Sequence, residues 1–295
     1  MHNAAEPGGP LDAQLTTPTT GLTVHYRDWG GTGRPILLLH GLASSAQIWD
    51  FVAPALRGRG HALAIDQRGH GATGKPDDGY AYATIVADLA GVVQALGLAP
   101  PIVVGHSWGA SVALSYAAQT PACPGAVLID GGIVDMQARP GATWDDTAAR
   151  LAPPDLTHLR LDDLVGYMGQ GPLGHLDAAF RRRFFHSLME EQPDGTVRPR
   201  LSRARHMAIL RAMWDERPGL LLAQVTCPLL VVVAEPPGVD AADPWQVTRR
   251  QSLARLGDHA HIEVERMPDT IHDIPLQRPA ALVARISTWM DAHGL

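Results

Sequence analysis

The sequence predicts an α/β fold in which a mostly parallel β-sheet is flanked by helices. Short apolar runs bounded by Gly and Pro recur along the 295-residue chain. Several of these runs are apolar throughout, as is typical of strands buried on both faces. Segments with helical spacing lie between them, and parallel strands need such crossover connections.

Four strands and one helix are predicted in the first part of the chain. "LTVHYRDWG" (22–30) alternates like a strand, "PILLLHG" (35–41) is continuously apolar, and "HALAIDQRGHG" (61–71) is a strand that runs into a turn. "YATIVADLAGVVQALGL" (82–98) has helical spacing, and "PIVVGH" (101–106) is again a buried strand.

The same alternation resumes after residue 106. "GAVLIDGG" (125–132) and "CPLLVVVAE" (227–235) are predicted to be buried strands, and "HIEVERM" (261–267) alternates like a further strand. "PAALVARISTWMDAHG" (279–294) is predicted to be a closing helix.

The chain divides into a core, an insertion and a tail. Residues 134–218 are helical in tendency but broken by Pro and Gly, and they interrupt the alternation, so we predict that they form an inserted helical lid. The core then comprises residues 22–133 and 219–295. Residues 1–21 are rich in Gly, Pro and Thr and are predicted to be a flexible tail.

Composition excludes several classes of protein. The net charge is −6, and Arg181-Arg182-Arg183 is the longest basic run, so we expect no nucleic-acid partner. No apolar stretch approaches the roughly 18 residues that span a bilayer, and the start does not resemble a secretory signal. We therefore expect a cytoplasmic protein that does not bind membranes.

The segment "GHSWG" (105–109) contains the candidate nucleophile, Ser107. It matches G-x-S-x-G, and the required context is present, with a buried strand before it and a helical run after it. A sharp strand-to-helix turn needs small neighbours, which Gly105 and Gly109 supply. Such a turn would lift the Ser107 hydroxyl out at the carboxyl edge of the sheet.

Two further segments are placed to act on Ser107. "HGLASS" (40–45) follows a neighbouring strand and must turn sharply, so the N–H groups of Leu42 and Trp108 would form an oxyanion hole. His272 lies in the loop "MPDTIHDIPLQRP" (267–279), between the last strand and the closing helix. From there an imidazole can reach the sheet edge, so His272 is the candidate base.

These motifs, in this order, resemble those of the α/β-hydrolase superfamily, in its lid-bearing branch of esterases, lactonases and perhydrolase-like enzymes. The resemblance rests on "HGLASS", "DQRGHGATGKP" (66–76), "GHSWGAS" and the terminal "HDIP", and it leaves the lid unassigned. It implies the α/β-hydrolase fold and a Ser-His-acid triad. In the second motif, Asp66 and Arg68 match residues that are usually structural in relatives.

The acid of the triad is less well defined by sequence. Many relatives place it just after the strand here written "LLVVVAE", but Pro237 stands near that point. Some relatives place it at the end of the preceding strand, where this chain has Asp130. Asp130 is the preferred acid, and Asp240, Glu235 and Asp243 remain alternatives.

The predicted function is hydrolysis of a carboxylic ester or lactone of a small-to-medium hydrophobic substrate through an acyl-enzyme. No metal or organic cofactor is expected, and the protein is expected to be a monomer or homodimer. Alternatives are a C–C bond hydrolase or a cofactor-free perhydrolase or oxygenase on the same fold. An alternative of another class is a receptor that binds a ligand without turnover.

Overall fold

A twisted eight-stranded sheet organises the part of the chain that the computed structural model describes, residues 9–257 and 259–295. The strand order is β1-β2-β4-β3-β5-β6-β9-β10. β2 pairs antiparallel with β1 and β4, and the other pairs are parallel. The strands are β1 (Leu11–Thr16), β2 (Thr23–Gly30), β3 (Pro35–Leu39), β4 (His61–Ile65), β5 (Ile102–His106), β6 (Ala126–Ile129), β9 (Leu229–Glu235) and β10 (Ile262–Pro268).

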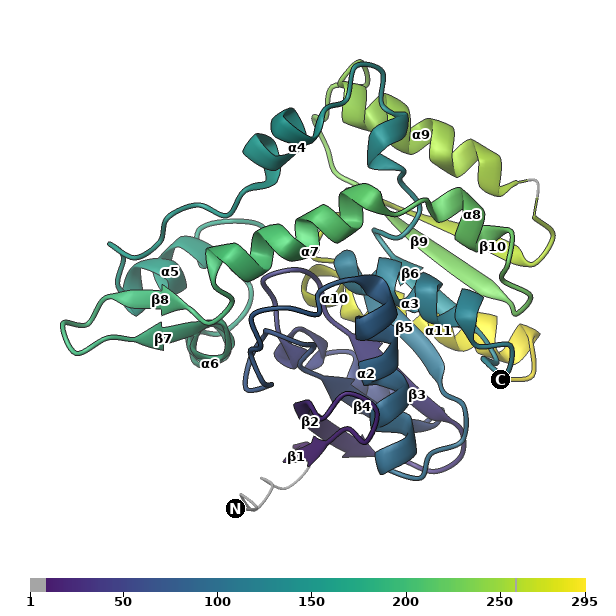
Figure 1. Cartoon of the computed structure of the whole chain (residues 1–295), viewed down its shortest axis with the longest axis horizontal. Coiled ribbons are helices and arrows are strands. Elements are labelled where there is room, and N and C mark those ends of the chain that lie inside the picture. Colours follow the sequence, from purple (N-terminus) through teal and green to yellow (C-terminus); the bar gives the residue numbers. More distant parts are fainter. Residues whose placement is uncertain (1–8, 258) are drawn as a thin grey trace.

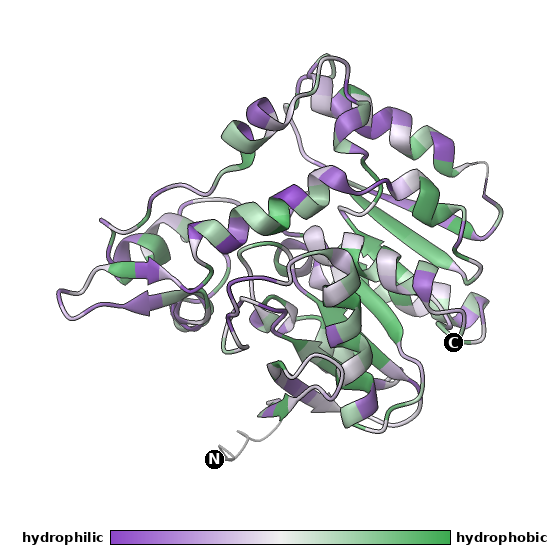
Figure 2. Ribbon diagram, viewed as in Figure 1, coloured by the Kyte–Doolittle hydropathy of each residue, from purple (hydrophilic) through white to green (hydrophobic). Residues whose placement is uncertain are grey.

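Helices cover both faces of this sheet (Figure 1). They are α1 (Ala53–Leu56), α2 (Tyr82–Ala95), α3 (Trp108–Gln119), α8 (Pro218–Leu222), α9 (Pro244–Leu256), α10 (Ile274–Gln277) and α11 (Pro279–Ala292). Alternate residues of one strand enter different cores, since Leu37 and Leu39 pack with the α2 and α3 side whereas Ile36 and Leu38 pack with α1 and α11. The central strands are accordingly hydrophobic throughout (Figure 2). The predicted fold class is confirmed.

The predicted strands and helices match observed ones to within a few residues, but some observed elements were not predicted. The prediction of a flexible tail is wrong for residues 11–16, which form β1 at the edge of the sheet; residues 1–8 of that tail lie outside the described residues. Helix α9 and the short helices α1, α8 and α10 were not predicted. β1 and α9 lack the apolar periodicity of a core element, because β1 is mostly exposed and two of the four buried residues of α9 are polar.

The insertion between β6 and α8, for which we keep the name lid, contains four α-helices and a hairpin within the described residues. They are α4 (Trp144–Leu151), α5 (Leu161–Met168), α6 (Ala178–Leu188), β7 (Met189–Glu191), β8 (Val197–Pro199) and α7 (Arg203–Asp215). α7 runs from the hairpin back across the core (Figure 1). Side-chain hydrogen bonds join the lid to the core, with Ser45 Oγ 2.6 Å from Ser187 Oγ and Ser115 Oγ donating to Glu216 at 2.6 Å.

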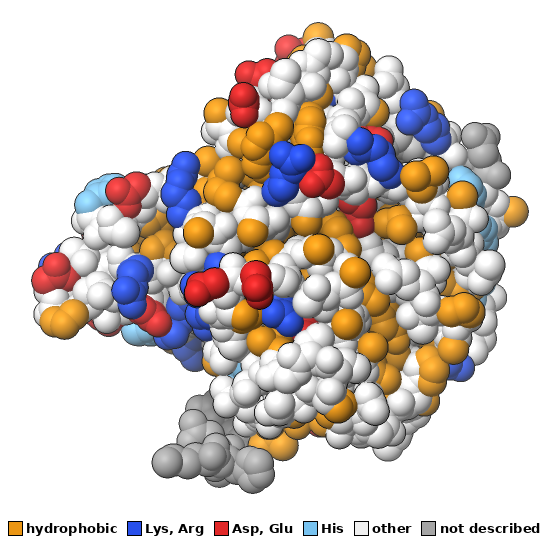
Figure 3. Space-filling model, viewed as in Figure 1, with side chains coloured by type: hydrophobic (Ala, Val, Ile, Leu, Met, Phe, Trp, Pro, Cys, Tyr) orange, Lys and Arg blue, Asp and Glu red, His pale blue; other side chains and the backbone are white. Residues whose placement is uncertain are grey.

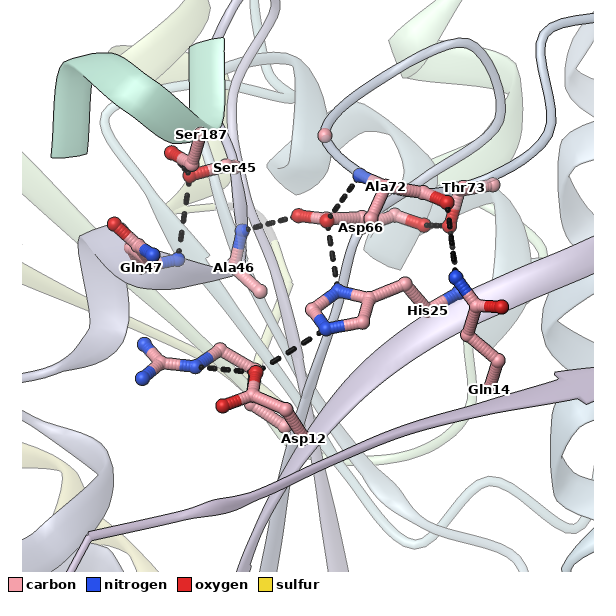
Figure 4. Close-up of polar contacts among 12 residues, drawn as sticks. Asp12, Gln14, His25, Ser45, Ala46, Gln47, Asp66, Ala72, Thr73 and Ser187 are labelled. Carbon is pink, nitrogen blue, oxygen red and sulfur yellow. Dashed lines mark hydrogen bonds and ion pairs between the residues drawn. The ribbon is translucent and has the colours of Figure 1, made fainter. Parts of the chain in front are cut away.

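Asp66 organises the turn after β4 (Figure 4). Its buried carboxylate accepts hydrogen bonds from the N–H groups of Ala46 and Ala72, at 2.8 and 2.9 Å, and lies 2.8 Å from His25 Nδ1. Asp12 Oδ1 lies 3.1 Å from the other ring nitrogen of His25. Because carboxylates face both nitrogens, the imidazole is held as the cation. This network connects β1 and β2 to the turn after β4 and to the segment that begins at Ala46.

Within the described residues, no helix combines the length and apolar character needed to cross a bilayer.

The His25 network predicts a pH-dependent stability. Burial lowers the pKa of His25, but the hydrogen bonds and charges of Asp12 and Asp66 outweigh it and raise the pKa from 6.5 to about 9. The stabilisation is therefore complete below pH 6.5 and is lost as pH rises through about 9. We expect His25→Gln to lower the free energy of unfolding by about 2 kcal/mol at pH 6, allowing for the half-exposed Asp12.

Urea denaturation of both proteins at pH 6 and pH 9.5 measures this effect, with His158→Gln, an exposed lid position, as control. The deficit of His25→Gln should shrink at pH 9.5. An equal deficit at both values would contradict an ionised His25.

Candidate active site

Ser107 occupies a strained turn between β5 and α3. Its φ is +56°, a left-handed conformation that side-chain-bearing residues rarely adopt, and its N–H donates to the carbonyl of Ile129 at 2.8 Å. A Cβ at Gly105 would lie 2.0 Å from the Gly109 carbonyl oxygen, and a Cβ at Gly109 would lie 2.4 Å from that of Leu39. Only glycine at both positions permits this turn, as the motif predicts.

The chain after β3 passes directly beside Ser107. A Cβ at Gly41 would lie 2.9 Å from the Ser107 Cβ, so the turn of residues 41–44, here called the oxyanion turn, contacts the candidate nucleophile. Within the described residues, the N–H groups of Leu42 and Trp108 donate no hydrogen bond to the protein. Both predicted oxyanion donors are thus free to bind a substrate oxygen.

His272 and Asp130 form a hydrogen-bonded pair. Asp130 directly follows β6, and its Oδ2 lies 2.7 Å from His272 Nδ1. Since a carboxylate only accepts, Nδ1 carries the proton and Nε2 is left free to act as a base. The His106 ring donates to the His272 carbonyl at 2.9 Å, which holds the His272 loop against the end of β5.

The electrostatics of the pair follow from this contact. Burial raises the pKa of Asp130, but the hydrogen bond and charge of His272 outweigh it, so the pKa is lowered and the carboxylate is ionised. Burial lowers the pKa of His272, but the hydrogen bond and charge of Asp130 outweigh it and the pKa is raised. The His272 side chain is 51% exposed, so it remains open to a reacting group.

The three alternative acids lie elsewhere and have other partners. Asp240 accepts from the N–H of Ala242 in its own turn. Asp243 caps α9 by accepting from the N–H groups at the helix start. Glu235 accepts from Arg266 at 2.8 Å. The structure therefore brings Asp130, and none of these three, into hydrogen-bond contact with His272.

Ser107, Asp130 and His272 line one cavity of about 400 Å³. No hydrogen bond joins Ser107 Oγ to His272 within the described part of the chain, which is common before a substrate aligns the two groups. Apolar side chains form most of the remaining wall: Ile133, Val134, Met136, Val231, Val233, Met213 and Trp245. The cavity therefore suits an apolar acyl or alcohol group.

The other histidines near the site have structural partners. His40 Nε2 accepts from the N–H of Gln67 at 3.0 Å, and His70 Nε2 accepts from that of Ala43 at 3.2 Å. Burial lowers the pKa of both His70 and His106 to about 3, so these two rings are neutral. His70 also stacks on the Trp108 ring, with centroids 5.3 Å apart. Through this contact and its hydrogen bond from Ala43, it holds the oxyanion turn next to Trp108.

Arg249 was not predicted as a site residue from the sequence. This residue of α9 lines the cavity and donates to Asp130 Oδ1 and, at 2.7 Å, to the Ala234 carbonyl. Asp130 Oδ1 also accepts from the N–H of Ala234 at 3.0 Å. One oxygen of Asp130 is thus fixed by Arg249 and Ala234, and the other holds His272. No motif marks Arg249, and its helix was not predicted.

Comparison with known proteins identifies the family. A profile described as "Alpha/beta hydrolase family" matches residues 36–286. The chain belongs to the alpha/beta hydrolase family. The resemblance inferred from the motifs is therefore confirmed at the level of the superfamily.

The curated relatives align with only part of the chain. A non-heme haloperoxidase of Rhodococcus erythropolis is 38% identical over 106 residues, which are 36% of this chain and 38% of that protein. A 2-(acetamidomethylene)succinate hydrolase of Mesorhizobium japonicum is 35% identical over 100 residues, 34% of this chain and 36% of that protein. The chain thus aligns with little more than a third of the length of these two curated relatives.

Solved structures match along nearly the whole chain. The crystal structure of E-2-(acetamidomethylene)succinate hydrolase has a TM-score of 0.77 and 25% sequence identity, and the match covers 96% of this chain and 99% of that one.

Arg249 provides a testable prediction. Its positive charge lowers the pKa of His272, so Arg249→Gln should raise that pKa and shift the acid limb of the kcat/KM profile to higher pH. Loss of a charged hydrogen bond should also reduce kcat about tenfold. Hydrolysis of p-nitrophenyl acetate between pH 5 and 9 measures both effects.

The matched control is Arg250→Gln, because within the described residues the neighbouring Arg250 donates to the exposed carbonyl of Ala241 alone. The control should leave the profile in place. A profile for Arg249→Gln that coincides with wild type would show that Arg249 does not position Asp130.

Proposed function

We propose that the protein is a serine hydrolase that cleaves a carboxylic ester or lactone through an acyl-enzyme. The observation that carries this proposal is the convergence of three elements at one sheet edge. These are Ser107 on its strained turn, the His272–Asp130 pair in the same cavity, and the free N–H groups of Leu42 and Trp108.

Each residue has a defined role in the reaction. His272 Nε2 takes the proton of Ser107 Oγ as that oxygen attacks the carbonyl carbon. The N–H groups of Leu42 and Trp108 donate to the developing oxyanion. His272 returns the proton to the leaving alcohol, and then deprotonates the water that releases the acid and frees Ser107.

Asp130 acts through His272. Its hydrogen bond from Nδ1 keeps Nε2 unprotonated in the resting enzyme and stabilises the imidazolium that forms. The apolar wall of the cavity supports a hydrophobic acyl or alcohol group as part of the substrate. A relative named as a hydrolase supports hydrolysis as the class of reaction.

The haloperoxidase relative supports a second candidate, perhydrolysis. The same acyl-enzyme would then react with hydrogen peroxide in place of water and release a peracid. Peroxide-dependent halogenation without added metal is the measurement that separates this candidate from simple hydrolysis. Under either candidate Ser107 is the nucleophile.

A fluorophosphonate should label Ser107. The reagent imitates the tetrahedral stage of acyl transfer, so an activated serine gives a stable adduct that intact mass spectrometry detects. Ser107→Ala should remain unlabelled and should lose about four orders of magnitude in p-nitrophenyl ester hydrolysis. Unlabelled wild-type protein, or equal labelling of the variant, would overturn the assignment of the nucleophile.

Asp130 and Asp240 offer a matched comparison for the acid. We expect Asp130→Asn to reduce kcat by about 10⁴-fold, because an amide at Oδ2 favours the wrong imidazole tautomer. Asp240→Asn removes a contact only within its own turn and should change kcat less than about twofold. Steady-state hydrolysis of p-nitrophenyl acetate decides between them, and the reverse order of effects would move the acid to the later loop.

A further inference from the structure

A second and larger cavity, of about 790 Å³, lies between the lid and the core beside the oxyanion turn. The core contributes Ala43, Ser44, His70, Gly71 and Lys75, and the lid contributes residues 151–157, 188–190, 198–203, 205 and 206. We call it the basic cavity, because five cationic side chains line it: Lys75, Arg198, Arg200, Arg203 and Arg205. Its size is typical of ligand sites.

The charge of the basic cavity is opposite to that of the chain. Five cations face only two lining carboxylates, Asp155 and Glu190, although the whole protein has a net charge of −6. Figure 3 shows Lys and Arg side chains beside Asp and Glu side chains on the visible face of the molecule. Glu190 is shared, at 2.6 Å from Arg198 and 3.7 Å from Arg200. Arg205 is also paired at 2.8 Å with Asp77, which lies outside the cavity lining. These three carboxylates still do not neutralise the five cations.

Two of the cations contact carbonyl oxygens alone. Lys75 Nζ donates to the carbonyls of Gly71 and Thr73, at 2.8 and 2.9 Å, and Arg203 donates to that of Pro153 at 2.9 Å. In the part of the chain that the structure describes, no carboxylate lies within 4.0 Å of either charge. Burial, with a further contribution from Arg200, lowers the pKa of Lys75, so an anion placed here would relieve unfavourable charge.

An unpaired hydroxyl lies beside the basic cavity. Ser44 lines the cavity, and its Oγ is buried without a hydrogen-bond partner among the described residues. Buried polar groups usually have partners, so this part of the cavity wall carries unused hydrogen-bonding capacity. The adjacent His70 cannot serve, because both its ring nitrogens already have backbone partners.

The position of the cavity relates it to the proposed reaction. Ala43 and Ser44 directly follow Leu42, whose N–H is a proposed oxyanion donor. The two cavities share no lining residue, so a substrate held at Ser107 would have to extend along the oxyanion turn to reach the basic cavity. The cavity wall also has apolar side chains, including Leu151, Leu188 and Leu201, which fit a hydrocarbon segment between the scissile carbonyl and a charged end.

We propose that the basic cavity binds a carboxylate at the end of the substrate remote from the scissile bond, with Lys75 and Arg200 as its principal ligands. Among the described residues Lys75 has no carboxylate partner, and the partner of Arg200, Glu190, lies 3.7 Å away and is shared with Arg198, whereas Arg203 is exposed. The substrate is then an ester or lactone whose acyl chain is apolar in the middle and carries a carboxylate at the end remote from the scissile bond. The identity of the substrate as an ester or lactone rests on the proposed function. The presence of an anion site in the basic cavity does not depend on that function.

The first experiment compares two ester series. One consists of mono-p-nitrophenyl esters of dicarboxylic acids from succinic to suberic, and the other has a terminal primary amide in place of the free carboxylate. At the best chain length, kcat/KM should favour the carboxylate by about tenfold or more, as a charged hydrogen bond does. Lys75→Gln and Arg200→Gln should each reduce that ratio about tenfold.

The control variant is Arg182→Gln, because Arg182 pairs with Asp162 on the lid and does not line the cavity. It should retain the wild-type ratio. Circular dichroism shows whether each variant folds, and two cavity variants are used so that a failure of one to fold leaves the other. A ratio near one in the wild type, unchanged in both cavity variants, would overturn the proposal.

The second experiment needs no catalysis. Calorimetric titration should show hexanoate binding at least about tenfold more tightly than hexanamide, with the difference lost in Lys75→Gln. If no ester is hydrolysed but this binding difference is found, the proposed function fails and the anion site stands. If esters are hydrolysed but hexanoate and hexanamide bind equally, the anion site fails and the hydrolase stands.

Discussion

Close backbone packing around one serine is the constraint on which the candidate site depends. Ser107 has a left-handed φ, and the chain segments beside it approach so closely that Gly41, Gly105 and Gly109 leave no space for a Cβ. A strained residue costs of order 1–3 kcal/mol. Buried strands on both sides of β5 supply the packing that offsets this strain, because they are apolar on both faces of the sheet.

The same packing places the other groups. Asp130 ends the strand next to β5, and the loop after β10 brings His272 back over that edge, where the His106 ring holds its carbonyl. The pair is then set by charge, since Asp130 has one oxygen on His272 and the other on Arg249 and Ala234. Sheet topology thus determines where the groups lie, and a short hydrogen-bond network determines their protonation.

Much of this architecture could be predicted from sequence, because it depends on local patterns. The strand–"GHSWG"–helix context specifies a turn that only glycine neighbours allow, and this identifies Ser107. His272 follows from chain order. The sequence favoured Asp130 as the acid but left Asp240 open, because the choice depends on which carboxylate the imidazole meets in space, and the structure has Asp130 in contact with His272. Arg249 and the basic cavity were invisible, since their residues come from separated segments and have no common motif.

β1 could not be predicted from local sequence patterns. Its residues are mostly exposed and are held by backbone pairing with β2 and by the contact of Asp12 with His25, neither of which leaves an apolar pattern in the sequence. The function of the lid residues could not be predicted from local patterns either. The lid helices pack on one another and on the core, and the charges that line the basic cavity are distinguishable from ordinary surface arginines only once the fold is known.

The most direct test of the account is a crystal structure of the protein after reaction with a phosphonate ester. We predict a covalent bond from phosphorus to Ser107 Oγ, with the phosphoryl oxygen about 3 Å from the N–H groups of both Leu42 and Trp108. His272 Nε2 should then lie within hydrogen-bond distance of Ser107 Oγ. An adduct on another residue, or a phosphoryl oxygen turned away from both N–H groups, would contradict the account.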